Sequence, residues 1–394
     1  MRNVIKATLD GFANRFNPSL QSNENALVLT GGGARAAYQA GVLQYIAEVF
    51  PEAQFPILTG VSAGSVNAAL LANHSGTFPE CVGNLVSWWG QLRTKDVMEP
   101  TSSFGFVRRM VRRGGREEIG EALPRQGMVD TTPLRVYLQD KLRTENGELS
   151  GITANVREGR LKAFAVFATN YGTGQTVTWV QGRNIQEWER PNRIGVNTTI
   201  TVDHIMASMA LPFLFPAVNI GDAWYGDGGV RLSHPLSPAI YLGASRILAI
   251  TTRYDRSRSE ADVPSVYGYP PAAQIFGLLM NAVFLDTLDQ DILTLERLNR
   301  LVDQLPRRHR MGLRPIRLLV MRPSVDLGKL AGEHEADLTG VIRLLARGLG
   351  SADTESPDWL SMLLLVPKYT RHLIEIGHRD AARQHERIAN FLAE

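Results

Sequence analysis

One short stretch of the sequence combines glycines and a serine at a spacing that suits nucleophilic catalysis. Residues 56–65 read Pro-Ile-Leu-Thr-Gly-Val-Ser-Ala-Gly-Ser, so a short apolar run ends in a Gly-x-Ser-x-Gly pattern. In this pattern a strand turns sharply into a helix, and Gly60 and Gly64 keep the tight turn free of side chains. The first N–H groups of the helix then point at the serine. We therefore expect Ser62 to be a nucleophile.

A second glycine cluster could bind a developing negative charge. Gly31, Gly32 and Gly33 follow the apolar run 26–30. Successive N–H groups without side chains, at a turn from strand to helix, form an anion-binding nest. Arg35 would add positive charge to its rim. The pattern predicts an oxyanion site that serves Ser62.

The same glycines also fit a dinucleotide-binding fingerprint, because Gly31-x-Gly33-x-x-Ala36 matches Gly-x-Gly-x-x-Gly/Ala. That fingerprint needs an acidic residue at the end of the next strand to hold a ribose. The next strand ends in Gly-Val-Ser instead, which disfavours a nucleotide. A phosphate-binding Walker A loop is excluded because no Gly-Lys-Ser/Thr follows.

Two kinds of residue are candidates for the base that activates Ser62. His234 is the best-placed histidine for a triad of serine, histidine and acid. Asp227 is the other candidate, because it lies among glycines that include Gly228 and Gly229. An Asp-Gly pair also favours a simple tight turn. These motifs alone leave the base open between His234 and Asp227.

The elements that must position these residues can be placed from their periodicity. Strand 26–30, helix 36–50 and strand 55–59 form a βαβ unit, which implies parallel strands and a right-handed crossover. Both glycine loops therefore lie at the carboxyl edge of one sheet, where ligands of such sheets bind. Further strands are expected at 161–169, 176–180, 246–252 and 316–321, and helices at 134–142, 201–210 and 272–305.

Bulk composition narrows the class of protein. The 394 residues are 44% hydrophobic and 21% charged, as in ordinary globular proteins, and the net charge of +3 implies no nucleic-acid partner. A single cysteine, Cys81, excludes an intramolecular disulfide framework and suits a reducing compartment. No signal peptide and no run long enough to span a membrane is seen, so we expect a cytoplasmic protein.

We divide the chain into a polar leader at 1–24, a main domain at 25–325 and a helical C-terminal region at 326–394. A basic insertion is expected at about 75–130. Within it, 104–113 reads as a helix with apolar residues on one face and four arginines on the other. Such a helix could dock peripherally on an anionic membrane or serve as a lid. The alternative is an ordinary surface helix.

The order of motifs resembles the patatin-like phospholipases. Gly-Gly-Gly-x-Arg is followed by Gly-x-Ser-x-Gly and later by Asp-Gly-Gly. Two further blocks are similar to that family: Phe-Ala-Thr-Asn at 167–170, and Ala-Ser-Met-Ala-Leu-Pro-Phe-Leu-Phe-Pro at 207–216. The resemblance covers about 25–325, with a weaker similarity at 359–381.

The resemblance implies a three-layer α/β/α fold with a mostly parallel central sheet and a helical C-terminal extension. It implies a Ser62–Asp227 catalytic dyad, an oxyanion site in the triple-glycine loop with Arg35, and a phospholipid or lysophospholipid substrate. No metal or cofactor is implied, and no cluster of His, Asp and Glu shows ligand spacing. The family loop usually has glycine where Ala36 stands, and alanine should still permit the helix to start.

Two other functions remain compatible with the same motifs. An acyl transferase of the carrier-protein type often has histidine before the elbow serine, whereas this chain has Val61. A catalytically silent lipid-binding protein is the second alternative. Intact Ser62 and Asp227 argue against it.

Overall fold

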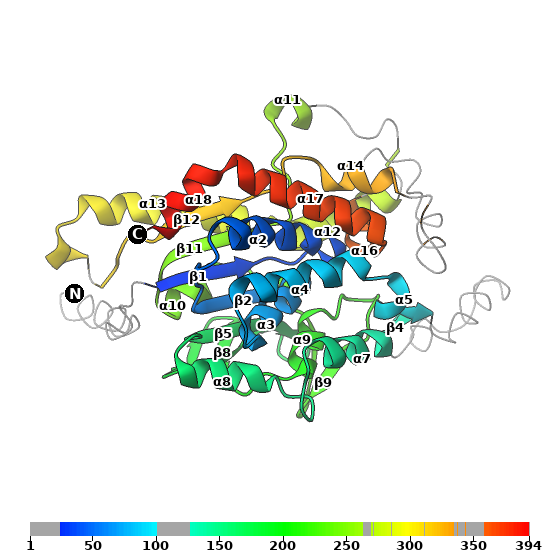
Figure 1. The fold of residues 1–394 in the computed structure, drawn as a ribbon, viewed down its shortest axis with the longest axis horizontal. Helices are drawn as coiled ribbons and strands as arrows, with labels where there is room; N and C mark the ends of the chain where they lie inside the picture. The colour runs from blue at the N-terminus through cyan, green and yellow to red at the C-terminus, as the bar shows by residue number, and fades with distance from the viewer. Residues whose placement is uncertain are drawn as a thin grey trace.

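The computed structural model describes residues 24–100, 127–262, 269–270, 272–284, 286–310, 312–334, 337, 343 and 358–393. The expected leader before residue 24 and the basic helix at 104–113 lie outside these residues. A mixed sheet forms the centre of the described structure, in the order β12-β11-β1-β2-β5-β6-β8-β7 (Figure 1). The strands are β1 (Glu24–Leu29), β2 (Ile57–Val61), β5 (Ala163–Asn170), β6 (Thr176–Gly182), β7 (Trp188–Arg190), β8 (Arg193–Asn197), β9 (Val218–Ile220), β10 (Ala223–Asp227), β11 (Ala244–Ile250) and β12 (Arg317–Met321).

Parallel pairing dominates the half of the sheet that carries the glycine motifs. β12, β11, β1, β2 and β5 are parallel neighbours, and β6 returns antiparallel to β5. The helices are α2 (Ala37–Val49), α3 (Ala63–Asn73), α4 (Phe78–Gln91), α5 (Thr94–Val97), α7 (Thr132–Lys141), α8 (Ser150–Glu158), α9 (Val202–Ser208), α10 (Ser237–Tyr241), α11 (Arg258–Ala261), α12 (Ala272–Phe284), α13 (Thr287–Gln304), α14 (Leu327–Gly332), α16 (Asp358–Leu363), α17 (Pro367–Arg383) and α18 (His385–Leu392). The βαβ unit and the three-layer α/β arrangement are thus confirmed.

The sheet separates two apolar cores, and alternation along the strands explains why. In β1, Leu27 and Leu29 point into the larger core, whereas Ala26 and Val28 point into the smaller one. A strand buried on both faces needs such an uninterrupted apolar run. Helices α2, α4 and α17 cover the face turned toward the viewer in Figure 1. Helices α10 and α13 supply residues to the core on the other face.

The C-terminal helices are built into the larger core. α17 runs along α2 at very close range: a Cβ on Gly41 would lie 1.9 Å from the carbonyl oxygen of Ile374, and one on Gly377 would lie 2.2 Å from that of Tyr38. Glycine on both helices is what allows the backbones to meet. The segment 358–393 therefore completes the layer that covers β1, as the red ribbon in Figure 1 shows.

Two expected elements differ in detail from the structure. β2 is Ile57–Val61, two residues later than the expected strand, so it leads directly into Ser62. The helix expected at 272–305 is two helices, α12 and α13. Between them, the N–H of Asp286 donates to the carbonyl of Asn281, five residues back instead of the four of an α-helix. The carboxylate of Asp286 forms an ion pair with Arg253. Within the described residues, no helix is long and apolar enough to cross a bilayer.

Candidate active site

Ser62 occupies a strained turn between β2 and α3. Its φ and ψ are 53° and −133°, a backbone conformation that residues other than glycine rarely adopt. The turn closes because a Cβ on Gly60 would lie only 2.5 Å from the carbonyl oxygen of Gly64, and a Cβ on Gly64 only 2.4 Å from that of Leu29. The sharp strand-to-helix turn predicted around Ser62 is therefore present.

Strand β5 brings Asp227 next to Ser62. β5 is longer than β2, and its residue Phe167 is paired with Val61, the last residue of β2. The next residue, Ala168, is paired with Asp227 at the end of β10. β10 thus takes the place beside β5 that β2 leaves free, and the serine and the carboxylate come together at that junction.

The carboxyl group of Asp227 is fully buried, and burial raises its pKa to about 7. Two hydrogen bonds oppose that shift: one from the Ser62 hydroxyl and one from the N–H of Gly229 to Oδ1, which measures 2.8 Å. Oδ2 has no partner at ordinary hydrogen-bond geometry within the described residues, so its contact with Ser62 is loose. Catalytic hydrogen bonds of unliganded enzymes are often loose in this way.

The triple-glycine loop lies against Ser62. A Cβ on Gly31 would be 3.0 Å from Cβ of Ser62, so the loop and the elbow touch. Gly33 has a φ of 57°, and a Cβ there would lie 2.1 Å from the carbonyl oxygen of Met362. Across the described chain, the N–H groups of Gly32 and Gly33 make no hydrogen bond of their own. They are available to an anion beside Ser62.

Arg35 lies behind the loop and points at helix α16. Its side chain is 3% exposed, and Nη2 pairs with Oδ1 of Asp358 at 2.5 Å. Its Nε donates to the hydroxyl of Ser361 at 2.5 Å. Asn281 of α12 donates to the other oxygen of Asp358 at 2.7 Å. The charge of the guanidinium is thus balanced by Asp358 of α16, and Arg35 joins the triple-glycine loop to the C-terminal segment.

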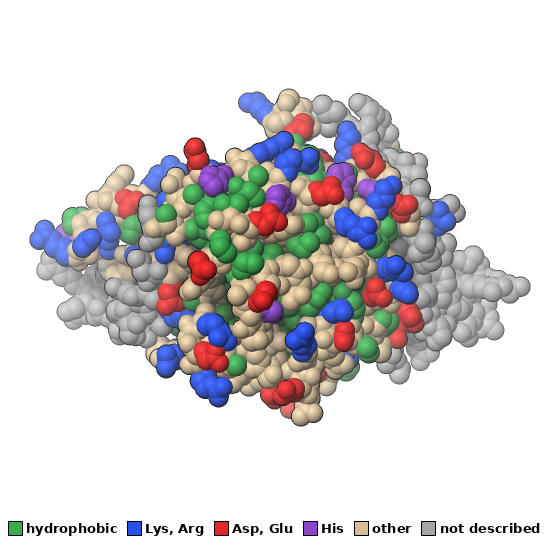
Figure 2. Space-filling view, in the orientation of Figure 1, with side chains coloured by type: hydrophobic (Ala, Val, Ile, Leu, Met, Phe, Trp, Pro, Cys, Tyr) green, Lys and Arg blue, Asp and Glu red, His purple; other side chains and the backbone are tan. Residues whose placement is uncertain are grey.

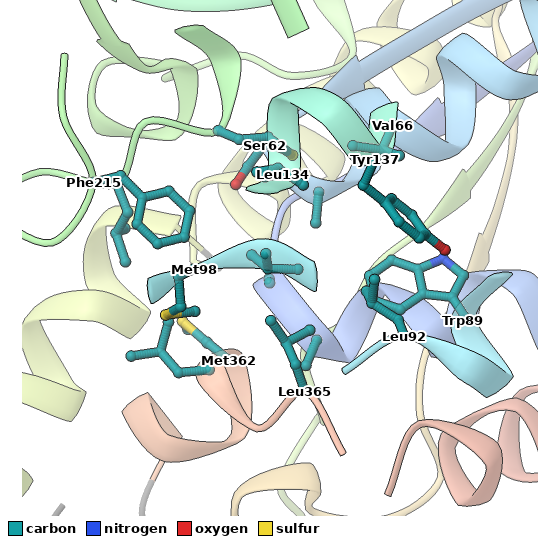
Figure 3. Close-up of a pocket in the computed structure, with 18 of the residues that line it drawn as sticks. Ser62, Val66, Trp89, Leu92, Met98, Leu134, Tyr137, Phe215, Met362 and Leu365 are labelled. Atoms are coloured by element: carbon teal, nitrogen blue, oxygen red, sulfur yellow. The ribbon is translucent and has the colours of Figure 1, made fainter. Parts of the chain in front are cut away.

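A narrow apolar cavity of about 110 Å³ opens beside Ser62. In Figure 3, Phe215 and Met98 lie at one end of it, and Trp89, Leu92 and Tyr137 lie at the other. α3, α4, α5 and α7 supply one wall, and α16 and the residues after it supply Met362, Leu363 and Leu365. Such a cavity suits a hydrocarbon chain.

A family model described as patatin-like phospholipase matches residues 27–240, more than half of the 394 residues. The chain belongs to the patatin-like phospholipase family. The match spans the triple glycine, the elbow and the Asp-Gly-Gly turn, in the order already found in the sequence. No curated protein matches the chain.

Several solved structures are similar to this patatin-like chain at low identity. VipD from Legionella pneumophila is 13% identical, over 87% of this chain and 67% of that one, with a TM-score of 0.33. Human GIVD cytosolic phospholipase A2 is 11% identical, over 98% of this chain and 63% of that one, with a TM-score of 0.44. The ExoU–SpcU complex from Pseudomonas aeruginosa is 15% identical, over 94% and 72%, with a TM-score of 0.28. The chain thus spans about two thirds of VipD and slightly less of the human enzyme.

Both His234, the histidine considered as an alternative base, and His204 have other partners in this patatin-like fold. His234 is exposed, and its Nδ1 contacts the hydroxyl of Ser233 at 2.8 Å. His204 is buried against Trp179, with ring centroids 4.5 Å apart, and burial lowers its pKa to about 4. Neither ring makes a hydrogen bond to Ser62 within the described structure.

Three residues of the site were not singled out by sequence reasoning. The hydroxyl of Ser208 accepts the N–H of Ser62 at 3.0 Å, and that of Thr252 donates to the carbonyl of Gly31 at 2.8 Å. Asp358 holds Arg35. Ser208 lies in the Ala-Ser-x-Ala block that marks the family resemblance, so a signal existed for it. Thr252 and Asp358 are joined to the site only by tertiary contacts.

Proposed function

We propose that this protein is a lipid acyl hydrolase of the phospholipase A or lysophospholipase type, in which Ser62 and Asp227 form a catalytic dyad. The observation that carries the proposal is a fully buried carboxyl group whose pKa is raised to about 7, in contact with a serine on a strained elbow. A base is most effective when its pKa lies near the working pH. An ordinary aspartate, with a pKa near 4, would be a feeble base toward a hydroxyl.

In the acylation step, Ser62 Oγ attacks the ester carbonyl of the lipid, and Asp227 takes the hydroxyl proton. The carbonyl oxygen becomes negatively charged and is stabilised by the N–H groups of Gly32 and Gly33. The tetrahedral intermediate collapses, the bond to the leaving alcohol breaks, and Asp227 returns the proton to that alcohol. The acyl chain remains as an ester on Ser62.

In the deacylation step, water enters where the alcohol left, and Asp227 removes its proton as it attacks the acyl-enzyme. The same N–H groups stabilise the second oxyanion. Breakdown releases the fatty acid and restores the Ser62 hydroxyl. Arg35 holds the glycine loop in place through Asp358 and Ser361, so we assign it a positioning role in this reaction.

A fluorophosphonate probe tests the proposal directly. The phosphonyl group reacts with an activated serine hydroxyl and leaves a stable adduct. We expect stoichiometric labelling of the wild type on Ser62, located by peptide mass spectrometry, and release of fatty acid from phospholipid or lysophospholipid. A silent lipid-binding protein would bind the same lipids without being labelled. Absence of both labelling and product would rule out the proposed function.

The shape of the cavity leads to a prediction about acyl-chain length. Val66 lies one turn after Ser62 on α3 and lines the cavity between the serine and Trp89 (Figure 3). Val66→Phe should block the far end and leave the serine open. Because each buried methylene contributes about 0.8 kcal/mol, kcat/KM should fall about fourfold for every methylene excluded. Turnover of a butyrate ester should be close to wild type, and that of a palmitate ester strongly reduced. Equal losses on both esters would contradict this placement of the chain.

The raised pKa of Asp227 leads to a prediction about pH. The carboxyl must be ionised to act as a base, so kcat/KM on a soluble short-chain ester should fall about tenfold per unit below about pH 7 and level off above it. The profile can be measured from pH 5 to pH 9 with p-nitrophenyl butyrate. His204→Ala and His234→Ala serve as controls and should keep the inflection. An inflection that disappears in His234→Ala would assign the base to a histidine.

A further inference from the structure

A second cavity, of about 270 Å³, lies on the opposite face of the sheet from the apolar cavity beside Ser62, which we call the acyl cavity. β6, β7, β8, α10, α13 and the segment 313–316 supply its walls, and none of its lining residues lines the acyl cavity. Leu236, Leu295 and Ile316 connect it to the smaller of the two apolar cores. The dyad chemistry makes no use of this cavity.

The lining of this cavity carries more positively charged than negatively charged side chains. Arg190, Arg193 and Arg314 all line it, together with His234, whereas Asp291 is the acidic residue among its lining. Asp291 is 8% exposed, and its Oδ2 already accepts the N–H of Leu236 at 2.8 Å. Arg314 donates to the main-chain carbonyls of Gly243 and Ala244. An excess of positive charge therefore remains around Arg190 and Arg193.

The surroundings of Arg193 favour the binding of an anion. It is half-buried, and within the described residues its guanidinium makes no hydrogen bond or ion pair. Burial lowers its pKa, the attraction of Asp291 raises it, and the repulsion of Arg190 lowers it again. Two like charges facing one partly desolvated space are unfavourable unless a counter-charge lies between them.

The remaining walls are apolar and aromatic. Leu298, Val302 and Leu313 form one side, and Trp188 and Tyr241 pack together on the other, with ring centroids 4.6 Å apart. The Arg190 guanidinium lies 5.9 Å from the centre of the Tyr241 ring, which fixes it at the edge of the aromatic wall. A ligand that fills this space needs a charged end and an apolar body.

The same end of the molecule is basic on its surface. η4 (Arg307–His309) follows α13, and Figure 2 shows Lys and Arg side chains gathered where these elements project at the left. Exposed leucines of α13 and of the residue that follows it precede these residues in the sequence: Leu293, Leu298, Leu301 and Leu305. An anionic amphiphile would therefore be attracted to the region before it reaches the cavity.

We propose that this cavity is a second, non-catalytic binding site for a phosphate monoester with an apolar body, whose phosphate is held between Arg190 and Arg193. Guanidinium groups match phosphate oxygens in geometry, and a monoester carries a charge of about −1.5 to −2 near neutral pH, which suits two arginines. The ligand could be a soluble alkyl phosphate or the head group of a membrane lipid. The assignment does not depend on the reaction proposed for Ser62.

The test compares Arg193→Gln with Arg183→Gln, a matched control at an exposed arginine that follows β6. Both are made in the Ser62→Ala background so that lipids are not consumed. Titration calorimetry with dodecyl phosphate, below its micellar concentration, should show a Kd about tenfold to a hundredfold weaker in Arg193→Gln than in the control. Inorganic phosphate should bind less tightly than dodecyl phosphate, because it lacks the apolar body. If the two variants bind dodecyl phosphate equally, the site is overturned as a site for a soluble phosphate monoester, and the vesicle experiment below then tests a lipid head group.

A second arm separates the two sources of the phosphate. Co-sedimentation is measured with phosphatidylcholine vesicles that contain or lack phosphatidic acid. Loss of the phosphatidic-acid-dependent binding in Arg193→Gln supports a lipid head group, whereas a loss confined to dodecyl phosphate supports a soluble ligand. Binding by the two variants that is equal with both probes overturns the proposal. Without ligand, Arg193→Gln should melt no lower than the control, because within the described residues the replaced guanidinium makes no hydrogen bond or ion pair and is repelled by Arg190. An unchanged melting temperature shows that the variant is folded.

Discussion

Replacing Ser62 with alanine, or Asp227 with asparagine, is expected to reduce ester hydrolysis by about 10⁴-fold or more. In the proposed mechanism, Ser62→Ala removes the oxygen that would carry the acyl group, and Asp227→Asn removes the base that would take the proton of that hydroxyl. The groups of a dyad act as a unit, so the double variant is expected to be no slower than the worse single variant. The measurement is kcat/KM on a soluble ester and on phospholipid vesicles, with His234→Ala as the control.

The Asp227→Asn variant should also show that its defect is chemical and not a loss of fold. The folded-state pKa of Asp227 is raised by burial, to about 7, above an unfolded value near 4. This carboxyl group therefore favours the folded state below pH 4, and that contribution is lost as the pH rises to 7. Asparagine carries no charge to bury, so the variant should gain melting temperature relative to wild type as the pH rises from 4 to 8. A melting temperature that falls at pH 8 would mean that Asp227 is needed for structure.

The second large effect is expected at Arg35. Arg35→Met leaves the largely buried carboxylate of Asp358 without its ion-pair partner. It also removes the hydrogen bond from Arg35 to the hydroxyl of Ser361. Breaking one side of a buried ion pair destabilises a protein by about 3–5 kcal/mol, and the part-exposed Asp358 places the expected loss toward the lower end. Because the glycine loop is tied to α16 through this pair, kcat should fall as well, by about 10²-fold, as it does when an oxyanion donor is lost.

A double variant separates charge from structure at this contact. Arg35→Met with Asp358→Leu removes both charges and keeps apolar volume, so it should recover much of the free energy of unfolding lost in the single variant. Turnover should recover less than stability, since the loop has lost its directional bonds. Urea unfolding and kcat on the soluble ester are the two measurements. Full turnover in Arg35→Met would show that the loop keeps its geometry without the arginine.

Local patterns were sufficient to predict the parts of the site that depend on neighbouring residues. The elbow at Ser62 follows from an apolar run, two glycines and a helix-forming stretch that are contiguous in the chain. The glycine loop is fixed beside it because a βαβ unit places both loops at one sheet edge. The close contact of Gly31 with the Ser62 side chain agrees with that reasoning.

The place of Asp227 beside Ser62 could be anticipated from the family resemblance. The strand pairing that puts it there could not be predicted from the sequence. It depends on β5 being longer than β2, so that β10 can pair with the excess. The partners of Arg35 were unforeseeable for a similar reason: they lie 323 and 326 residues away in the sequence, at Asp358 and Ser361. No periodicity or local spacing carries information about contacts of that range.

The close contact of α2 with α17 has a consequence for the order in which the protein can be made. The ribosome adds about 5–20 residues per second, so the 326 residues between Arg35 and Ser361 take roughly 15–65 s to synthesise. During that time the glycine loop lacks α16, and α2 exposes the groove in which α17 will lie. Until then the glycine loop lacks the contacts of Arg35 with Asp358 and Ser361, and the face of α2 that packs on α17 is uncovered. We therefore expect the proposed oxyanion site to become ordered only after α16 and α17 have been synthesised and have docked.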